Sequence, residues 1–225
     1  MDVSLWSSPT LIVCLVRFLC AYDTRNMASP VLFRTYTARK NPSYNCTIVE
    51  GARATCATPK IFKSIDIGPD YLRSTYIGGE WRSNNPSQFV LSEADDLLLQ
   101  PISCLLSIGT GRINNLDFDH SSNLSQVLKH IAGDCETTHQ RTAQQFKSDV
   151  YFRLNVEQGL QASWMDSKNL RDVAAHTRQY LMEAEINQRV DLLVEKLFMS
   201  KVEPKKPASD VCFSLVQVVG LDLKN

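Results

Sequence analysis

The chain has no excess of either charge. It contains 24 Lys and Arg residues and 24 Asp and Glu residues among 225, so its formal net charge is zero. Proteins that attract nucleic acid or anionic membranes through their overall field carry a positive surplus. The composition therefore argues against nucleic acid as a partner. With 44% hydrophobic and 21% charged residues, it predicts a globular protein with one sizeable core.

The chain also has no apolar run of the length that crosses a membrane, which is about 20 residues. The run at residues 11–22 is shorter and contains Arg17. It lacks the basic start and the small-residue cleavage site of a signal peptide. We therefore expect a buried strand over residues 11–22, no transmembrane segment and a cytoplasmic protein.

Paired cysteine spacing is absent as well. The seven cysteines are an odd number without any C-x-x-C pair, and several, such as Cys104, lie inside apolar runs. This pattern predicts buried free thiols in a reducing compartment and argues against a disulfide framework.

What is present is an alternation of strand and helix patterns. Apolar periodicity predicts further strands over residues 31–38, 101–108 and 149–156, and helices over residues 47–58, 86–99, 121–147 and 169–198. Thr47 and Glu50 have the spacing of a capping box at the start of the first helix. The alternation predicts a layered α/β fold.

The stretch YIGGEWRSNNP, residues 76–86, has two glycines after an apolar pair and an Asn-Asn-Pro turn before a helix. Alone, it predicts a strand followed by a tight connection. Four other short motifs surround it in a fixed order. They are Ala-Arg-Ala-Thr at 52–55, Ser-Ile-Gly-Thr-Gly at 107–111, YFRLNVEQGLQ at 151–161 and HTRQYL at 176–181.

This ordered set resembles the carboxy-terminal half of the patatin-like phospholipases (the PNPLA domain), particularly the fungal type. The resemblance implies a partial domain over residues 15–200, with an unmatched segment at 1–14 and an unmatched tail at 201–225. It implies a three-layer α/β sandwich whose amino-terminal strands and nucleophile elbow are missing. It also implies a lipid acyl hydrolase that acts on phospholipid or acylglycerol through a Ser–Asp dyad, without metal or cofactor.

Both dyad groups are missing from this chain. The family carries its serine on a G-x-S-x-G elbow, where a base and N–H donors activate it. No two of the nine glycines here are four positions apart, so that motif does not occur. Aligning the Asn-Asn-Pro ends places Gly78 at the position of the dyad aspartate. Glu80, the remaining carboxylate candidate, is in an unsuitable register.

Two interpretations follow and stay open. In the first, the chain is a truncated or degenerate patatin-like domain without catalytic residues. In the alternative, it belongs to an active or formerly active phospholipase or acylglycerol lipase whose serine is encoded upstream.

A zinc site is a weaker hypothesis. His130, Asp134, Cys135 and His139 fall within one predicted helix. The first two share a face by their i, i+4 spacing, but the other two lie about 100° round the helix. We therefore predict no metal site.

Two further features have simple explanations. Gly109-Thr110-Gly111 could cradle a phosphate, but no dinucleotide or P-loop fingerprint follows it, so a strand-ending turn is predicted. Cys56 has no visible base to activate it and is predicted to be a buried structural cysteine.

Overall fold

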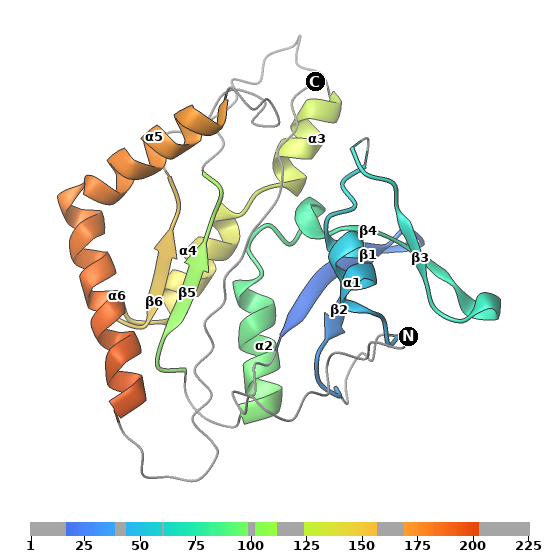
Figure 1. Cartoon of the computed structure of the whole chain (residues 1–225), viewed down its shortest axis with the longest axis horizontal. Helices are drawn as coiled ribbons and strands as arrows, with labels where there is room; N and C mark the ends of the chain where they lie inside the picture. Colours follow the sequence, from blue (N-terminus) through green and yellow to red (C-terminus); the bar gives the residue numbers. More distant parts are fainter. Residues whose placement is uncertain are drawn as a thin grey trace. The chain divides into compact units, whose positions relative to one another are not determined.

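The computed structural model describes residues 17–38, 44–59, 61–98, 102–111, 124–156 and 169–202 (Figure 1). These residues form a mixed α/β structure, which confirms the fold class at that level. The chain divides into two compact units, Met1–Ser83 and Asn84–Asn225. The boundary falls inside the YIGGEWRSNNP stretch.

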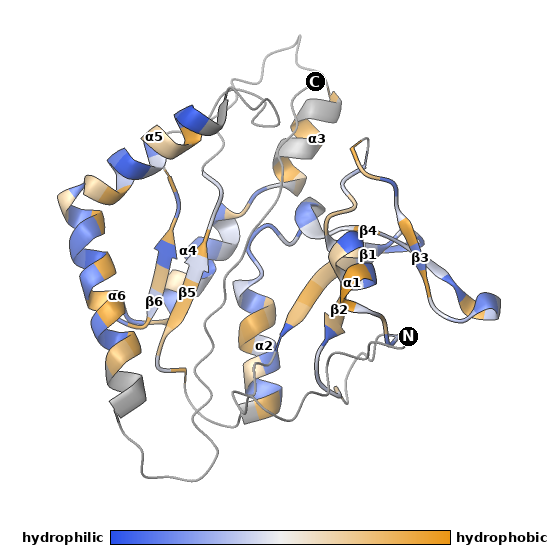
Figure 2. Cartoon of the chain, viewed as in Figure 1, coloured by the Kyte–Doolittle hydropathy of each residue, from blue (hydrophilic) through white to orange (hydrophobic). Residues whose placement is uncertain are grey.

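The first unit is built on a four-stranded antiparallel sheet with the order β2-β1-β4-β3. Its strands are β1 (Phe18–Asp23), β2 (Asn26–Arg34), β3 (Ile65–Ile67) and β4 (Ser74–Gly78). Asp23 pairs with Asn26, so a two-residue turn joins β1 to β2, and β2 begins earlier than the sequence predicted. In Figure 2, β1 is hydrophobic along most of its length. Its central residues Cys20, Ala21 and Tyr22 are all buried.

Helix α1 (Ile48–Thr55) packs on this sheet. The predicted capping box is confirmed, because the Glu50 N–H donates to Thr47 Oγ1 (3.2 Å) and the Thr47 N–H donates to Glu50 Oε2 (2.7 Å). The short 3₁₀ turns η1 (Asp70–Leu72) and η2 (Gly79–Trp81) flank β4. The core between helix and sheet consists of Ala21, Phe33, Ala54, Ile67 and Tyr76.

The second unit contains a parallel pair of strands, β5 (Leu105–Ile108) and β6 (Tyr151–Leu154). Helix α6 (Ala184–Val202) packs on one face, where Phe152 and Cys104 meet Leu193. Helix α4 (Glu136–Gln145) contacts β6 and also packs against α2 (Ser87–Leu98). Helices α3 (Leu124–Ala132) and α5 (Asn169–Met182) complete the described part of this unit.

Two sequence predictions need correction here. The helix predicted over residues 121–147 is wrong, because two helices, α3 and α4, occupy this stretch. Asp134 ends the run: its carboxylate accepts hydrogen bonds from the backbone N–H groups of Glu136 (2.8 Å) and Thr137 (3.4 Å), and so caps the start of α4. The strand predicted over residues 11–22 begins at Phe18, and residues 11–16 lie outside the described residues.

The helical structure predicted over residues 169–198, as one long helix or a pair, is present as two helices, α5 and α6. Within the described ranges, no helix is both long and apolar enough to cross a membrane. The unmatched segment at 1–14 and the tail from 203 onward lie outside what the structure describes.

Candidate functional site

Gly78, the position that the resemblance assigns to the dyad aspartate, ends strand β4. Its N–H donates to the Ala57 carbonyl at 3.0 Å. A Cβ built on Gly78 would lie 3.0 Å from the Thr55 carbonyl oxygen and would collide with the Glu80 carboxylate. The space where a side chain at this position would begin is therefore filled by another residue's carboxyl group.

The carboxyl of Glu80 lies beside Gly78. Residues Gly79–Trp81 form the turn η2, and this turn folds the carboxyl of Glu80 back beside Gly78. Burial raises the pKa of this carboxyl, and hydrogen bonds from its own backbone and from Thr58 lower it by less. Its Oε1 is buried without a hydrogen-bond partner among the described residues. The site thus holds a carboxyl group that favours its neutral form.

This environment predicts a pH-dependent stability. Because the folded pKa of Glu80 is raised above its ordinary value of 4.5, the stability that this group contributes is present below pH 4.5 and is lost as the pH rises through the folded pKa. Glu80→Gln, which cannot ionise, should melt at a higher temperature relative to wild type at pH 7 than at pH 4. Thermal unfolding across this range measures the difference. The exposed Glu183→Gln should show no such trend, and a pH-independent difference for Glu80→Gln would contradict the assignment.

The nearest serine in the sequence is otherwise engaged. Ser83 Oγ lies 2.9 Å from the Tyr22 hydroxyl in a buried hydrogen bond. The hydroxyl that bonds to Glu80 belongs to Thr58. A nucleophilic serine requires a base within hydrogen-bond reach, and the contacts of Glu80 and Ser83 do not form such a pair.

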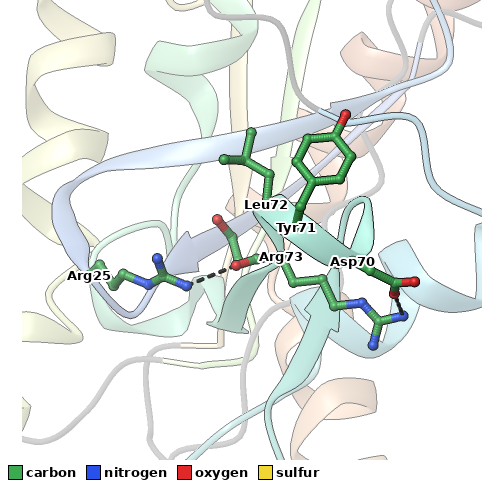
Figure 3. Close-up of a pocket in the computed structure, with 6 residues that line it drawn as sticks. Arg25, Asp70, Tyr71, Leu72 and Arg73 are labelled. Atoms are coloured by element: carbon green, nitrogen blue, oxygen red, sulfur yellow. Dashed lines mark hydrogen bonds and ion pairs between the residues drawn. The ribbon is translucent and has the colours of Figure 1, made fainter.

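A surface hollow of about 280 Å³ lies elsewhere in the first unit (Figure 3). Arg73 pairs with Asp70 at 2.8 Å, and Arg25 donates to the Arg73 carbonyl at 2.8 Å. Tyr71 and Leu72 are largely exposed beside them. Sequence analysis gave these residues no role, and the hollow's lining contains no acid–base pair aimed at a nucleophile, so it does not resemble a hydrolase site.

The second unit joins motifs that are far apart in the sequence. Asn85 Oδ1, from Asn-Asn-Pro, accepts hydrogen bonds from Ser87 Oγ (2.5 Å) and Ser107 Oγ (3.2 Å). Ser107, from Ser-Ile-Gly-Thr-Gly, in turn accepts from Arg153 Nη1 at 2.7 Å. All four of these residues are buried. Three of the five motifs therefore meet in one hydrogen-bonded chain.

Asn155, two positions after Arg153, brings in a fourth motif through hydrogen bonds of its own. Its backbone N–H donates to the Tyr180 hydroxyl of HTRQYL at 3.1 Å, and its Oδ1 accepts from the Gly111 N–H at 2.8 Å. We refer to Asn85, Ser107, Arg153, Asn155 and Tyr180 as the motif cluster. Sequence analysis identified the motifs but not these contacts. The signal was the polar pair Arg153 and Asn155 at alternate positions of an otherwise apolar strand.

Three of the four candidate zinc ligands have separate roles. Asp134 caps α4, Cys135 Sγ accepts from Arg153 Nη2 (3.2 Å), and His139 Nδ1 lies 3.2 Å from the Tyr151 hydroxyl. The side chain of His130 lies outside the described residues. In the described ranges, no group of His, Cys, Asp and Glu could hold a metal ion.

The prediction that Cys56 is buried is wrong. Cys56 is exposed at the C-cap of α1, because its backbone N–H bonds back to the Ala52 carbonyl (3.1 Å) and the chain turns at the helix end. Cys20 and Cys104 form no disulfide and are buried, as predicted.

Comparison with known proteins adds no relative. No family model, no curated protein and no solved structure matches the chain.

Proposed function

We propose that the chain is a patatin-like lipid acyl hydrolase domain that has lost ester hydrolysis in this form. The motif cluster supports the family assignment: four motifs selected by sequence resemblance alone contribute residues to two neighbouring hydrogen-bonded groups, one through Ser107 and Arg153 and one through Asn155. The three-layer sandwich and a phospholipid or acylglycerol ligand belong to the same proposal.

The state of position 78 carries the proposal that activity is lost. Gly78 stands where the resemblance requires the base, and Glu80 and Thr55 occupy the space around it. Loss of a general base costs about 10²–10⁴ in rate. The chain also contains no G-x-S-x-G, so the nucleophile and its base are missing together.

An ester assay tests this proposal. The purified chain should hydrolyse a short-chain nitrophenyl ester no faster than buffer, and a fluorophosphonate probe should label none of its serines. A catalytically active serine lipase, measured in parallel, provides the positive control. Turnover above buffer, together with a labelled serine mapped by mass spectrometry, would contradict the proposed loss of activity.

One observation favours the alternative of a working dyad whose serine lies outside this chain. A carboxyl group is present beside Gly78 even though the aspartate is not, because Glu80 supplies it. In the alternative, the same assay on a protein that includes the serine would show turnover, and Glu80→Gln would abolish it. If Glu80→Gln left the turnover unchanged, Glu80 would not be the base.

A further inference from the structure

Arg153 is a buried cation without an acidic partner. Arg153 lies in β6 and is only 6% exposed. Its guanidinium donates hydrogen bonds to two neutral groups, Ser107 Oγ and Cys135 Sγ. Within the described residues, the ion pairs do not include Arg153. A buried charge of this kind is costly unless an opposite charge compensates it.

The neighbouring thiol does not supply the missing charge. Burial raises the pKa of Cys135, and this effect is larger than the lowering caused by Arg153. The thiol therefore stays protonated near neutral pH, and the guanidinium keeps its positive charge uncompensated.

Two buried donors beside this charge are unused. Arg153 Nε and Asn155 Nδ2 have no hydrogen-bond partner among the described residues. The two residues are two positions apart in an extended segment, so their side chains point to the same side. The two side chains pack against Gly109: a Cβ built there would collide with Asn155 Oδ1 and would lie 2.7 Å from Asn155 Cγ and 2.8 Å from Arg153 Nη2.

The position in the fold is one where ligands commonly bind. Gly109–Gly111 is the turn at the carboxyl end of β5, which runs parallel to β6, and open parallel sheets bind ligands beyond the carboxyl ends of their strands. Gly111 has a φ of +116°, which favours glycine, and Thr110 between the two glycines is exposed. Two of the three residues in this turn are therefore glycines, which place no side chain over Arg153 and Asn155.

We propose that Arg153 and Asn155, beneath the Gly109–Gly111 turn, bind a small oxyanion such as phosphate. The anion would neutralise the guanidinium and accept hydrogen bonds from Arg153 Nε and Asn155 Nδ2. Charge-assisted hydrogen bonds between a guanidinium and oxyanions are the strong ones in proteins. The ligand should be an anion with acceptor oxygens, because the two unpartnered atoms are N–H donors and the guanidinium is positively charged.

Thermal unfolding of the whole chain in inorganic phosphate tests the proposal. The phosphate concentration is varied at constant ionic strength by exchange for sodium chloride. The melting temperature should rise saturably, by roughly 5 °C when phosphate is in large excess over its dissociation constant. A parallel titration with acetate distinguishes a preference for tetrahedral oxyanions from binding of any carboxylate. Absence of a saturable rise with both anions would overturn the proposal.

Variants assign any effect to this site. Arg153→Gln should abolish the phosphate effect, whereas Arg171→Gln, an exposed arginine in the same unit, should leave it unchanged. If Arg153→Gln does not fold, Asn155→Asp serves instead: it retains the acceptor for the Gly111 N–H and places a carboxylate where the anion would lie. Asn155→Asp should therefore fold and lose the phosphate effect. A phosphate effect that persists in Asn155→Asp, or that disappears in Arg171→Gln, would contradict the site.

Discussion

Asn85→Ala should lower the free energy of unfolding by about 3–5 kcal/mol. The Asn85 Oδ1 atom accepts hydrogen bonds from the Ser87 N–H, Ser87 Oγ and Ser107 Oγ, and all three donors are buried. Each buried group left without a partner costs about 1–3 kcal/mol. Urea unfolding, compared with wild type at equal slope, measures the loss.

Asn85→Asp is the matched control for this change. It keeps an oxygen acceptor at the same place and loses only the long contact from Asn85 Nδ2 to the Cys135 carbonyl (3.5 Å). At acid pH, where the new carboxyl is neutral, its cost should therefore be about 1 kcal/mol, within the range of one weak hydrogen bond, and the ionised form adds the cost of a buried charge. Equal costs for the two variants would show that the acceptor does not hold the motif cluster together.

Gly78→Ala should destabilise the first unit by about 2–3 kcal/mol, in the range measured for overpacked interiors. The backbone of Gly78 has φ −59° and ψ 155°, a conformation that alanine adopts freely, so strain in the main chain does not contribute. The cost arises because the added methyl group displaces the Glu80 carboxyl and presses on the Thr55 carbonyl. Thermal or urea unfolding measures it.

A double-mutant cycle identifies the cause of that cost. In Gly78→Ala/Glu80→Ala, the colliding carboxyl is absent and only the contact with Thr55 remains. The double variant should therefore be more stable than the sum of the two single changes predicts, with a coupling of about 1–2 kcal/mol. Strict additivity would mean that Glu80 does not occupy the space beside Gly78.

The features that could be predicted from the sequence are those that depend on neighbouring residues. The capping box of Thr47 and Glu50 lies within one helical turn, and the glycines that end β5 act on their own backbone. The helix predicted across residues 121–147 was wrong because residues 134–147 are polar residues that a helix also accepts, whereas the Asp134 carboxylate caps a new helix. Apolar periodicity carries no information about which side-chain bonds compete with it.

The candidate site shows the same limit over longer distances. The sequence identified Gly78 and Glu80 as the two positions of interest for a carboxylate. It did not reveal the 3₁₀ turn η2, which contains Glu80. The contact between Ser107 and Arg153 joins residues 46 positions apart, and no local pattern encodes it. Cys56 likewise is exposed because it lies at the end of α1, where the direction of the following chain decides whether a residue is covered.

The parallel pairing of β5 and β6 has a consequence for the order of folding. The β1–β2 hairpin closes across a two-residue turn, so its contacts cost little chain entropy. The Ser107–Arg153 contact closes a loop of 46 residues, and contacts of that sequence separation are made slowly. We therefore expect the hairpin to form early and the contacts that unite the motifs to be completed late in folding.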